Sequence, residues 1–277
     1  SLHKVTVYTD LYDIFSDMKF VGFENYVKLI LDNKFWWSLV TSLAYGLFTI
    51  PTGIFLSLIL AVVLNNKFKG NSFFRSSYFL PNVLDVYVVG LIWTLLLAPK
   101  YGLIDQFLNN IGIQFFSEKG FLGNPSIALF TIALVMVLKG CGFGMILFLT
   151  AIQNIPESVY EAADIDGASW FHKLRFITIP LVKPIIFFMA TVGIIGALNT
   201  FTEIYAMTNA SGGPDFVVKN IPFFIGTTQG ATKVSGFYLY QNFNIGKYGY
   251  SAAISYLLLI VGLIISMINR KIIGSSE

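Results

Sequence analysis

Three acidic residues lie close together in the stretch EAADIDGASW, residues 161–170, and acidic clusters of this kind can support metal chemistry. Asp164 and Asp166 form an Asp-x-Asp pair, and Glu161 precedes them by three residues. Such carboxylates can hold Mg²⁺ beside a phosphate group. In a helix, however, positions i and i+2 point about 200° apart, and the sequence has no glycine-rich phosphate loop. The stretch therefore favours another role over metal catalysis.

Polar residues inside long apolar runs form a second group of candidates, because polar side chains are costly inside a membrane and often mark a functional path. The candidates are Asn82, Asp85 and Tyr87 in one run and Asn199, Glu203 and Tyr205 in another. Spacings of three and four residues would put each amide and the carboxylate after it on one face of a helix. Amides, carboxylates and aromatic rings around one cavity suit a hydroxyl-rich solute such as a sugar.

Other interpretations of these polar residues stay open. Asp85 and Glu203 could instead lie at wet helix ends and contact nothing that passes. Lys139, midway along a third run, could neutralise them, form a structural ion pair or extend to the membrane surface. Gly140 and Gly144 beside it form a Gly-x-x-x-Gly pair, which favours a close helix crossing over a binding site.

The elements that would position these residues are transmembrane helices. Of the 277 residues, 55% are hydrophobic and only 12% are charged, whereas soluble chains average about 25% charged residues. A helical span needs about 20 mainly apolar residues. Five segments qualify: residues 36–64, with a tilt or kink expected at Pro51, and residues 78–97, 127–150, 185–207 and 250–268. We therefore predict an all-α integral membrane protein with one transmembrane domain over residues 36–277.

The distribution of Lys and Arg predicts the orientation of these spans. Arg75, Arg175 and Arg270 fall on one side, together with Lys67, which places the C-terminus in the cytoplasm and Ser117 outside. Five spans then put the start of the chain outside. We expect one further span to precede it in the full-length protein, which would complete a core of six helices.

Residues 1–35 are predicted to form an extracellular segment. Within it, residues 22–33 read GFENYVKLILDN and make an amphipathic helix candidate. Its apolar stripe consists of Phe23, Tyr26, Val27, Ile30 and Leu31. The helix either lies on the outer membrane face or packs as an ordinary extracellular helix. Trp36 and Trp37 follow where an aromatic belt would lie.

The segment 153–184, between the third and fourth spans, carries strong signals for two short helices. Asn154 suits a helix start, and Gly167 suits a helix end or a chain reversal. A second helix is predicted to begin near Ser169, and Pro180 and Pro184 are predicted to end it before the next span. Its aromatic residues are too many for a solvated loop. The segment therefore either docks into a groove on a cytoplasmic partner or rests on the spans of its own chain.

Several classes of site are disfavoured by composition. The single cysteine, Cys141, excludes an intramolecular disulfide and a cysteine-based zinc site. A net charge of +3 without a basic cluster gives no reason to expect nucleic acid as a partner. The chain also lacks a Walker motif. We expect no cofactor, no metal site and no enzymatic activity in this chain itself.

The loop and several other stretches resemble a known family. EAADIDGA, followed by ITIP, resembles the EAA loop of binding-protein-dependent ABC importer permeases, with Ile179 in place of the usual Leu. The wider chain is similar to sugar-uptake permeases of the maltose and glycerol-phosphate type. This similarity rests on FVGFENYVKLI (20–30), FFRSSYFLPN (73–82), GFLGNPSIAL (120–129), SGGP (211–214) and GYSAAIS (249–255). Residues 221–247 are longer and richer in Gly and Thr than the family pattern leads us to expect.

The resemblance implies a mechanism in which the loop is the coupling element. It would sit in a cleft of a cytoplasmic ATPase subunit, where Glu161 would pair with a basic residue and Gly167 would permit the turn between two coupling helices. The residues implied to couple are Glu161, Ala162, Ala163, Asp166, Gly167, Trp170 and Pro180. Closure of the ATPase subunits on ATP would move the loop and switch the bundle from inward-open to outward-open.

The resemblance also implies partners and a function. The importer would contain a second, homologous permease subunit, two ATPase subunits that use ATP and Mg²⁺, and an extracellular solute-binding protein. It would lie in the lipid of a bacterial cell membrane and import a sugar or oligosaccharide. Two alternatives remain. An ion-coupled secondary transporter would work without ATP, and a membrane-embedded transferase would use Asp164 and Asp166 with Mg²⁺.

Overall fold

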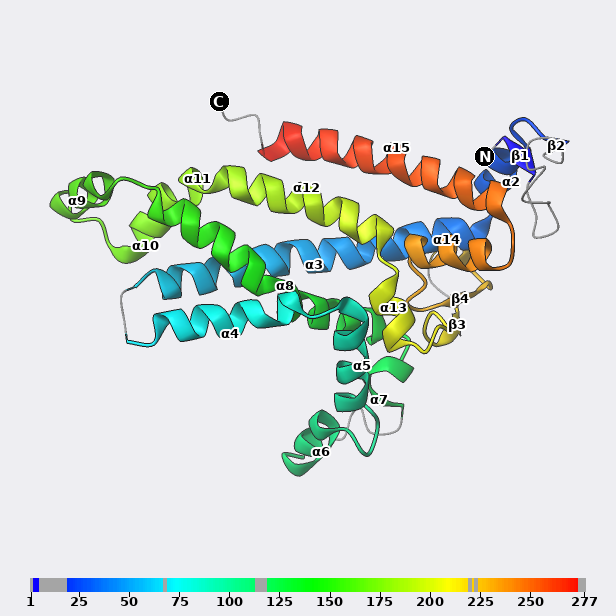
Figure 1. Ribbon diagram of the computed structural model, residues 1–277, viewed down its shortest axis with the longest axis horizontal. Coiled ribbons are helices and arrows are strands. Elements are labelled where there is room, and N and C mark those ends of the chain that lie inside the picture. The colour runs from blue at the N-terminus through cyan, green and yellow to red at the C-terminus, as the bar shows by residue number, and fades with distance from the viewer. Residues whose placement is uncertain are drawn as a thin grey trace.

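The computed structural model describes residues 2–4, 19–66, 69–112, 119–218, 221 and 224–273. Lys67, Ser117 and, in the predicted N-terminal segment, residues 1 and 5–18 lie outside these residues. The described chain is mainly helical, as predicted. Long helices run side by side along the longest axis of the molecule (Figure 1).

Three helices are long and apolar enough to cross a membrane by themselves. They are α3 (Asn33–Asn65), α8 (Ala128–Gln153) and α15 (Tyr248–Ile273). They correspond to the first, third and fifth predicted spans, and α3 continues through Pro51 as a single helix. Few of their residues are polar, so their side chains are compatible with lipid. Each helix forms the hydrogen bonds of its own backbone.

The second predicted span is not one helix. α4 (Asn71–Val83) and α5 (Val86–Leu96) are separated by Leu84 and Asp85 and meet at an angle of 100°. The prediction was wrong because hydropathy is continuous across residues 78–97 while the backbone is extended at Leu84. As a result α5 leaves the bundle, and α6 (Leu103–Asn110) lies beyond it (Figure 1).

The fourth predicted span is also interrupted. α12 (Lys183–Asn199) ends before Thr200 and Phe201, and the short α13 (Thr202–Met207) follows. α14 (Ser235–Asn244) supports this break, because the Ser235 hydroxyl donates to the carbonyl oxygen of Leu198 at 2.8 Å. A Cβ on Gly236 would lie 2.6 Å from the carbonyl oxygen of Asn199. A second bent pair consists of residues 170–181 and α12; if this pair and the pair of α4 and α5 each form one span, the described residues contain up to five candidate spans.

Short elements cover the end of the bundle where α15 begins (Figure 1). β1 (His3–Lys4) pairs antiparallel with β2 (Lys19–Phe20), and β3 (Asp215–Val217) pairs antiparallel with β4 (Thr228–Gly230). Trp37 is buried under the second hairpin, where its indole donates to the carbonyl oxygen of Gly230 at 3.1 Å. Its prediction as a residue of an aromatic belt was therefore wrong.

The amphipathic helix is present as α2 (Glu24–Ile30). Leu29 is fully buried against Phe35 and Ile254, which fixes α2 to the bundle. Most of the predicted apolar stripe faces away from the protein: Phe23, Val27, Ile30 and Leu31 are exposed. This arrangement suits a helix that rests its apolar face on a membrane surface.

Glycines set the closest helix crossings. A Cβ on Gly142 would overlap the backbone of Tyr78, so α4 crosses α8 at this residue. A Cβ on Gly144 would overlap Ser57, as predicted for a close crossing, whereas Gly140 has nothing within 4 Å of that position. The crossing glycines are therefore Gly142 and Gly144 rather than Gly140 and Gly144.

Candidate functional site

The loop between α8 and α12 projects from one end of the bundle (Figure 1). It consists of α9 (Glu157–Ile165), α10 (Trp170–Lys173), the π-helical η1 (Leu174–Thr178) and α11 (Ile179–Leu181). Two helices joined at a glycine were predicted, and this is confirmed. The second helical stretch ends at Leu181, between Pro180 and Pro184, as predicted. Pro180 lies at the start of α11, where its missing N–H costs little, and the chain bends by 61° into α12.

Gly167 reverses the chain between α9 and α10. Its φ is +73°, a left-handed conformation that glycine adopts without a steric penalty. The Gly167 N–H donates to the carbonyl oxygen of Asp164, and the Ala168 N–H donates to that of Ala163 at 2.9 Å. These two bonds form a Schellman motif that satisfies the last carbonyls of α9.

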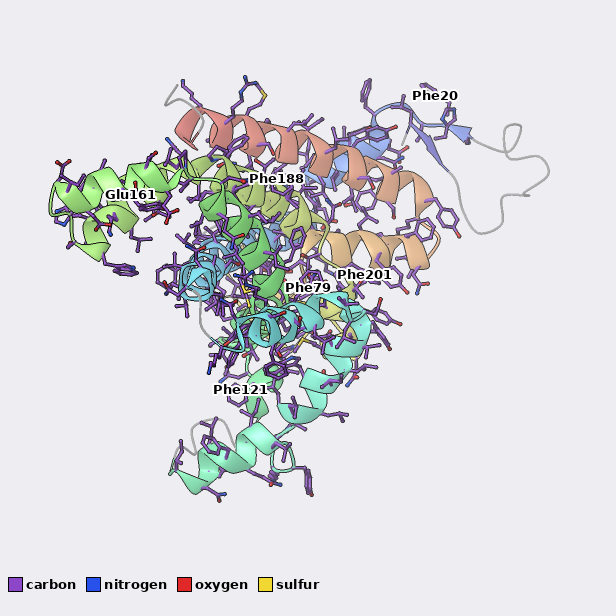
Figure 2. The ribbon with its side chains drawn as sticks, turned by 60° about the vertical axis from the view of Figure 1, so that its left-hand side comes forward. Phe20, Phe79, Phe121, Glu161, Phe188 and Phe201 are labelled. Atoms are coloured by element: carbon purple, nitrogen blue, oxygen red, sulfur yellow. The ribbon has the colours of Figure 1, made fainter. Side chains whose placement is uncertain are left out.

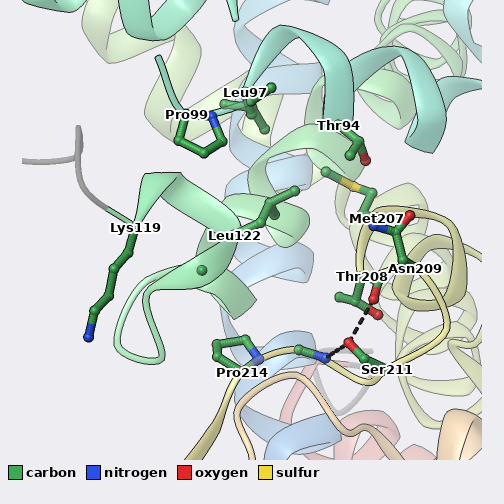
Figure 3. A pocket seen from close by; sticks show the side chains of 13 residues that line it. Thr94, Leu97, Pro99, Lys119, Leu122, Met207, Thr208, Asn209, Ser211 and Pro214 are labelled. Atoms are coloured by element: carbon green, nitrogen blue, oxygen red, sulfur yellow. Dashed lines mark hydrogen bonds between the residues drawn. The ribbon is translucent and has the colours of Figure 1, made fainter. Parts of the chain in front are cut away.

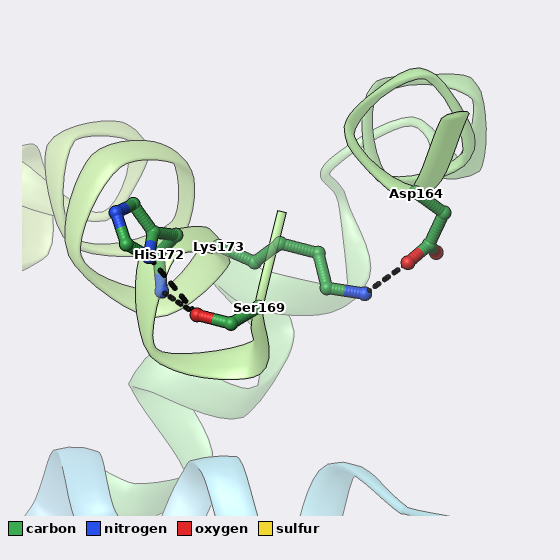
Figure 4. A network of polar contacts seen from close by, with 4 residues as sticks. All are labelled: Asp164, Ser169, His172 and Lys173. Atoms are coloured by element: carbon green, nitrogen blue, oxygen red, sulfur yellow. Dashed lines mark hydrogen bonds and ion pairs between the residues drawn. The ribbon is translucent and has the colours of Figure 1, made fainter. Parts of the chain in front are cut away.

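Side-chain contacts tie the two halves of the loop together. Lys173 forms an ion pair with Asp164 at 2.7 Å, and the Ser169 hydroxyl contacts Nδ1 of His172 at 2.9 Å (Figure 4). The Tyr160 hydroxyl bonds with that of Thr178 at 3.0 Å. The ion pair uses one carboxylate of the Asp-x-Asp pair. The loop is thus a unit whose helices keep a fixed arrangement.

The loop leaves large apolar side chains exposed. Ile165 is 87% exposed, Trp170 is 63% exposed and Phe171 is 61% exposed. Glu161 is exposed near the tip, far from the bundle (Figure 2). Of the other predicted coupling residues, Ala162, Asp166, Gly167 and Pro180 are exposed and Ala163 is buried. In the chain alone, the tip of the loop does not rest on the protein's own spans.

The first predicted pair in the substrate path does not share a helix face. Asn82 lies in α4, whereas the Asp85 carboxylate accepts a hydrogen bond from the backbone N–H of Tyr87 at 2.8 Å and caps α5. The 100° bend lies between them. An N-cap aspartate stabilises the start of a helix. Asp85 was predicted to lie within a span, but it begins a new helix.

The second predicted pair is separated in the same way. Asn199 ends α12 and donates to the carbonyl oxygen of Ile195 at 2.8 Å, while Glu203 lies in α13. Glu203 accepts a hydrogen bond from the Tyr45 hydroxyl at 3.2 Å. The prediction that Asn199 and Glu203 share one face of a helix was therefore also wrong.

The two helix breaks nevertheless meet in space. α5 packs on α13, and a Cβ on Gly90 would lie 2.7 Å from that of Ala206. This contact brings the rings of Tyr87 and Tyr205 to a centroid separation of 6.3 Å. Broken backbone at membrane depth is tolerated where it is buried in protein or lines a cavity. Both breaks carry an acid and a tyrosine that sequence reasoning had selected.

Lys139 does not neutralise these acids. Its ammonium lies 3.3 Å from the carbonyl oxygen of Asn82, near the C-terminal end of α4. A cation is favourable there because the last carbonyls of a helix carry partial negative charge. The close ion pairs of the described residues include Lys28 with Glu24 and Lys173 with Asp164, and none joins Lys139 to Asp85 or Glu203.

A pocket of about 380 Å³ lies where α5, α7 (Gly120–Gly123) and the turn after α13 meet (Figure 3). Two stretches noted in the sequence, GFLGN and SGGP, contribute to its wall. The Ser211 hydroxyl donates to the carbonyl oxygen of Thr208 at 2.7 Å and holds the turn (Figure 3). Most of the lining is apolar or uncharged, with Lys119 at the rim.

Sequence reasoning missed a cluster of aromatic residues beside the breaks. The ring of Phe201 lies 4.3 Å from that of Tyr240, and Tyr240 lies 5.6 Å from Tyr205. Tyr45, which bonds to Glu203, was also missed. Tyr240 falls in the stretch 221–247 that departs from the family pattern, which was the available signal. Within the described ranges, no three His, Cys, Asp or Glu side chains converge on a metal site.

Comparisons with known proteins agree with this architecture. The family described as "Binding-protein-dependent transport system inner membrane component" matches residues 53–273. The probable ABC transporter permease protein YesP of Bacillus subtilis (strain 168) is 32% identical and aligns over 94% of this chain and 79% of its own. The trehalose/maltose transport system permease protein MalF of Thermococcus litoralis is 31% identical over 91% of this chain and 79% of its own.

Among solved structures, a bacterial ABC transporter involved in alginate import has the same fold, with a TM-score of 0.77. Its chain is 21% identical, and the alignment covers 93% of this chain and 85% of that one. The matched family spans the broken helices, the projecting loop and α15. The chain belongs to the family of inner-membrane components of binding-protein-dependent transport systems.

Proposed function

We propose that this chain is a permease subunit of an ATP-driven importer that carries a sugar or oligosaccharide into the cytoplasm. Relatives named as permeases for trehalose and maltose, arabinooligosaccharides and lactose support the substrate class. A solved relative in complex with a substrate-bound periplasmic protein supports an extracellular binding protein as a partner. A second permease and two ATPase subunits, which use ATP and Mg²⁺, would complete the importer.

The observation that carries this proposal is the projecting loop. Its exposed apolar residues, Ile165, Trp170 and Phe171, would be unfavourable in water over a large patch. Internal contacts make the loop rigid enough to transmit a displacement. The loop is proposed to dock into a cleft on a cytoplasmic ATPase subunit. Under this proposal, α9, α10 and the C-terminus lie in the cytoplasm.

The meeting point of the helix breaks is the proposed path of the solute. Two tyrosines, Tyr87 and Tyr205, lie together there, and Asp85 and Glu203 flank them. Aromatic faces and polar groups are suitable for a sugar, whose ring is apolar on one face and whose hydroxyls donate and accept hydrogen bonds. Asn82 and Asn199 end the helices that lead to the two breaks and remain proposed contacts.

A test of coupling uses the complete transporter in proteoliposomes. Glu161→Ala should leave assembly intact but reduce ATP-driven uptake by about tenfold or more, because loss of one partner of an interfacial ion pair costs about 2–5 kcal/mol. Uptake and ATP hydrolysis are measured together, with ATP or with an ion gradient alone. Uptake that is driven by the gradient and ignores ATP would refute an ABC importer.

The matched control is Glu24→Ala. Glu24 is a glutamate on α2, at the end of the bundle opposite the loop (Figure 1). The substitution Glu24→Ala removes the same charge as Glu161→Ala and should leave the ratio of uptake to ATP hydrolysis unchanged. Equal uptake by Glu161→Ala and by the control would show that Glu161 has no part in coupling.

A further inference from the structure

A pocket of about 500 Å³ lies at the end of the molecule opposite the projecting loop, where α14 packs beside the start of α3 (Figure 1). The residues that matter in its wall are Lys34, Lys233, Lys247, Tyr205, Tyr240 and Gln241. Its volume falls in the range of small-molecule sites. The pocket combines positive charge, aromatic rings and an amide.

The three lysines form no close ion pair with a described carboxylate, although an acid, Asp215, lies near enough to Lys233 to affect its pKa. Within the described part of the chain, no carboxylate lies within 4.0 Å of the ammonium of Lys34, Lys233 or Lys247. Burial lowers the pKa of Lys233, Asp215 offsets part of that shift, and Lys34 adds to it. An anion in the pocket would relieve both the desolvation and the repulsion between the lysines.

The fold holds Lys233 in place through two glycines. A Cβ on Gly212 would lie 3.3 Å from Cε of Lys233, and a Cβ on Gly230 would lie 3.3 Å from its Cβ. Gly212 has a φ of +82°, so the SGGP turn packs closely against the lysine stem. Lys233 thus has a packed stem and is one of the residues that line the pocket.

Asp32, two residues before Lys34, already has hydrogen-bond partners. Asp32 caps α3 and accepts hydrogen bonds from the hydroxyls of Tyr238 and Tyr250, the latter at 2.6 Å. Burial, together with Asp32, raises the pKa of Tyr238 to about 12, so its hydroxyl stays protonated and donates. Asp32 is thus committed to the joint between α3, α14 and α15.

An aromatic wall leads from this pocket to the helix breaks. Tyr240 contacts Phe201 and Tyr205, and Tyr205 lies 6.3 Å from Tyr87. Phosphate or another small inorganic anion would gain little from such a wall. A sugar ring would stack on it and present its hydroxyls to Gln241.

We propose that this pocket binds a saccharide that carries a carboxylate, with the acid at the three lysines and the ring against Tyr205 and Tyr240. The proposal rests on the import function and narrows its substrate to acidic sugars or their oligomers. At the far end of the wall, the Asp85 carboxylate accepts a hydrogen bond from the Tyr87 N–H, and Glu203 accepts one from the Tyr45 hydroxyl.

The test measures binding to the complete membrane complex in nanodiscs by calorimetry. The probes are the trisaccharides of galacturonate and of glucuronate, each compared with its methyl ester, which keeps the shape and removes the charge. At least one acid should bind about tenfold tighter than its ester, a difference of about 1.4 kcal/mol. Combined replacement of Lys34, Lys233 and Lys247 by Met should abolish this preference.

Two variants control for charge and folding. Lys119→Met removes a lysine from the rim of a different pocket and should keep the preference. Lys233→Arg, in the otherwise unchanged chain, should also keep it. Size-exclusion profiles and basal ATP hydrolysis verify that each complex is assembled.

Equal binding of every acid and its ester would overturn the proposal. So would a triple variant that weakens docking of the extracellular binding protein equally with acidic and neutral sugar, because the lysines would then form a protein contact. ATP-driven uptake of a panel of neutral and acidic saccharides tests the import function separately. Uptake of neutral sugars without acid preference would refute only the pocket, whereas no ATP-driven uptake would refute the import function.

Discussion

Gly167 is the residue on which the shape of the projecting loop depends. Its φ of +73° directs α10 back alongside α9 and so allows Lys173 to reach Asp164. A Cβ at this position would contact nothing within 4 Å. Any effect of a side chain there therefore comes from backbone strain, not from a clash.

Gly167→Ala should lower ATP-driven uptake by about fivefold, because a left-handed alanine costs about 1 kcal/mol, which is about fivefold in a conformational population. Gly226→Ala is the matched control, since Gly226 also has a positive φ, +79°, and open space around it. Gly226 lies near the hairpin of β3 and β4, at the other end of the molecule. Proteoliposome uptake should fall only for Gly167→Ala; equal losses would show that the strain acts through general stability.

Two substitutions of Asp85 distinguish the role of its negative charge from its role as a helix cap. Asp85→Ala removes the cap of α5 and should cost about 1 kcal/mol of stability. Asp85→Asn keeps a capping oxygen and should leave the melting temperature nearly unchanged. If the carboxylate contacts the solute, both variants should slow uptake or change sugar preference. Normal uptake by Asp85→Asn across a panel of oligosaccharides would assign Asp85 to the helix alone.

At the scale of elements, the crossing of α4 and α8 is as important as the loop. Gly142 lets the backbone of Tyr78 approach α8, and Gly144 does the same for Ser57 on α3. Lys139 then reaches the end of α4. The crossing thereby fixes where α4 ends and where α5 turns away from the bundle.

Gly142→Ala should lower the melting temperature of the purified protein, because overpacking costs about 1–3 kcal/mol. Gly140→Ala, two residues earlier in the same helix, meets open space and should be neutral or stabilise by up to about 1 kcal/mol from helix propensity. Thermal unfolding in detergent distinguishes the two. A drop for Gly140→Ala equal to that for Gly142→Ala would contradict the crossing described above.

At the scale of the whole molecule, the two ends of the bundle differ in chemistry. The loop end exposes apolar side chains such as Trp170 and Phe171. The opposite end carries two hairpins, α2, α14 and the pocket with three lysines. A transporter needs such a difference, because one end must receive a solute and the other must respond to a motor.

Thiol labelling tests this orientation in intact cells and inside-out vesicles, in a Cys141→Ala background. Cysteines at Ser72, in the first turn of α4, and at Ser169 should react with impermeant reagents only from the cytoplasmic side. Ser117 is an outer position in the predicted topology but lies outside the described residues, so exposed Asn244 on α14 serves as the outer position. Reaction of all three from one side would refute the orientation.

The sequence by itself determined the membrane class, the helix–glycine–helix loop and three of the long helices. These depend on hydropathy summed over about 20 residues and on local signals such as Gly167, Ser169 and Asp164, which act within one or two turns. It also selected Tyr87 and Tyr205, although they are 118 positions apart in the sequence. It did so from residue type alone, without knowing that they would meet.

Only the tertiary structure decided where spans break and what the breaks join. Hydropathy is blind to the 100° turn at Asp85, because Leu84 and its neighbours are as apolar in an extended backbone as in a helix. The face shared by two residues depends on the helix being continuous, so both predicted pairs failed at a break. The lysine pocket assembles residues from the start of α3, from α13 and from α14. Contacts between segments so distant in sequence come from packing, and no local pattern in the sequence records them.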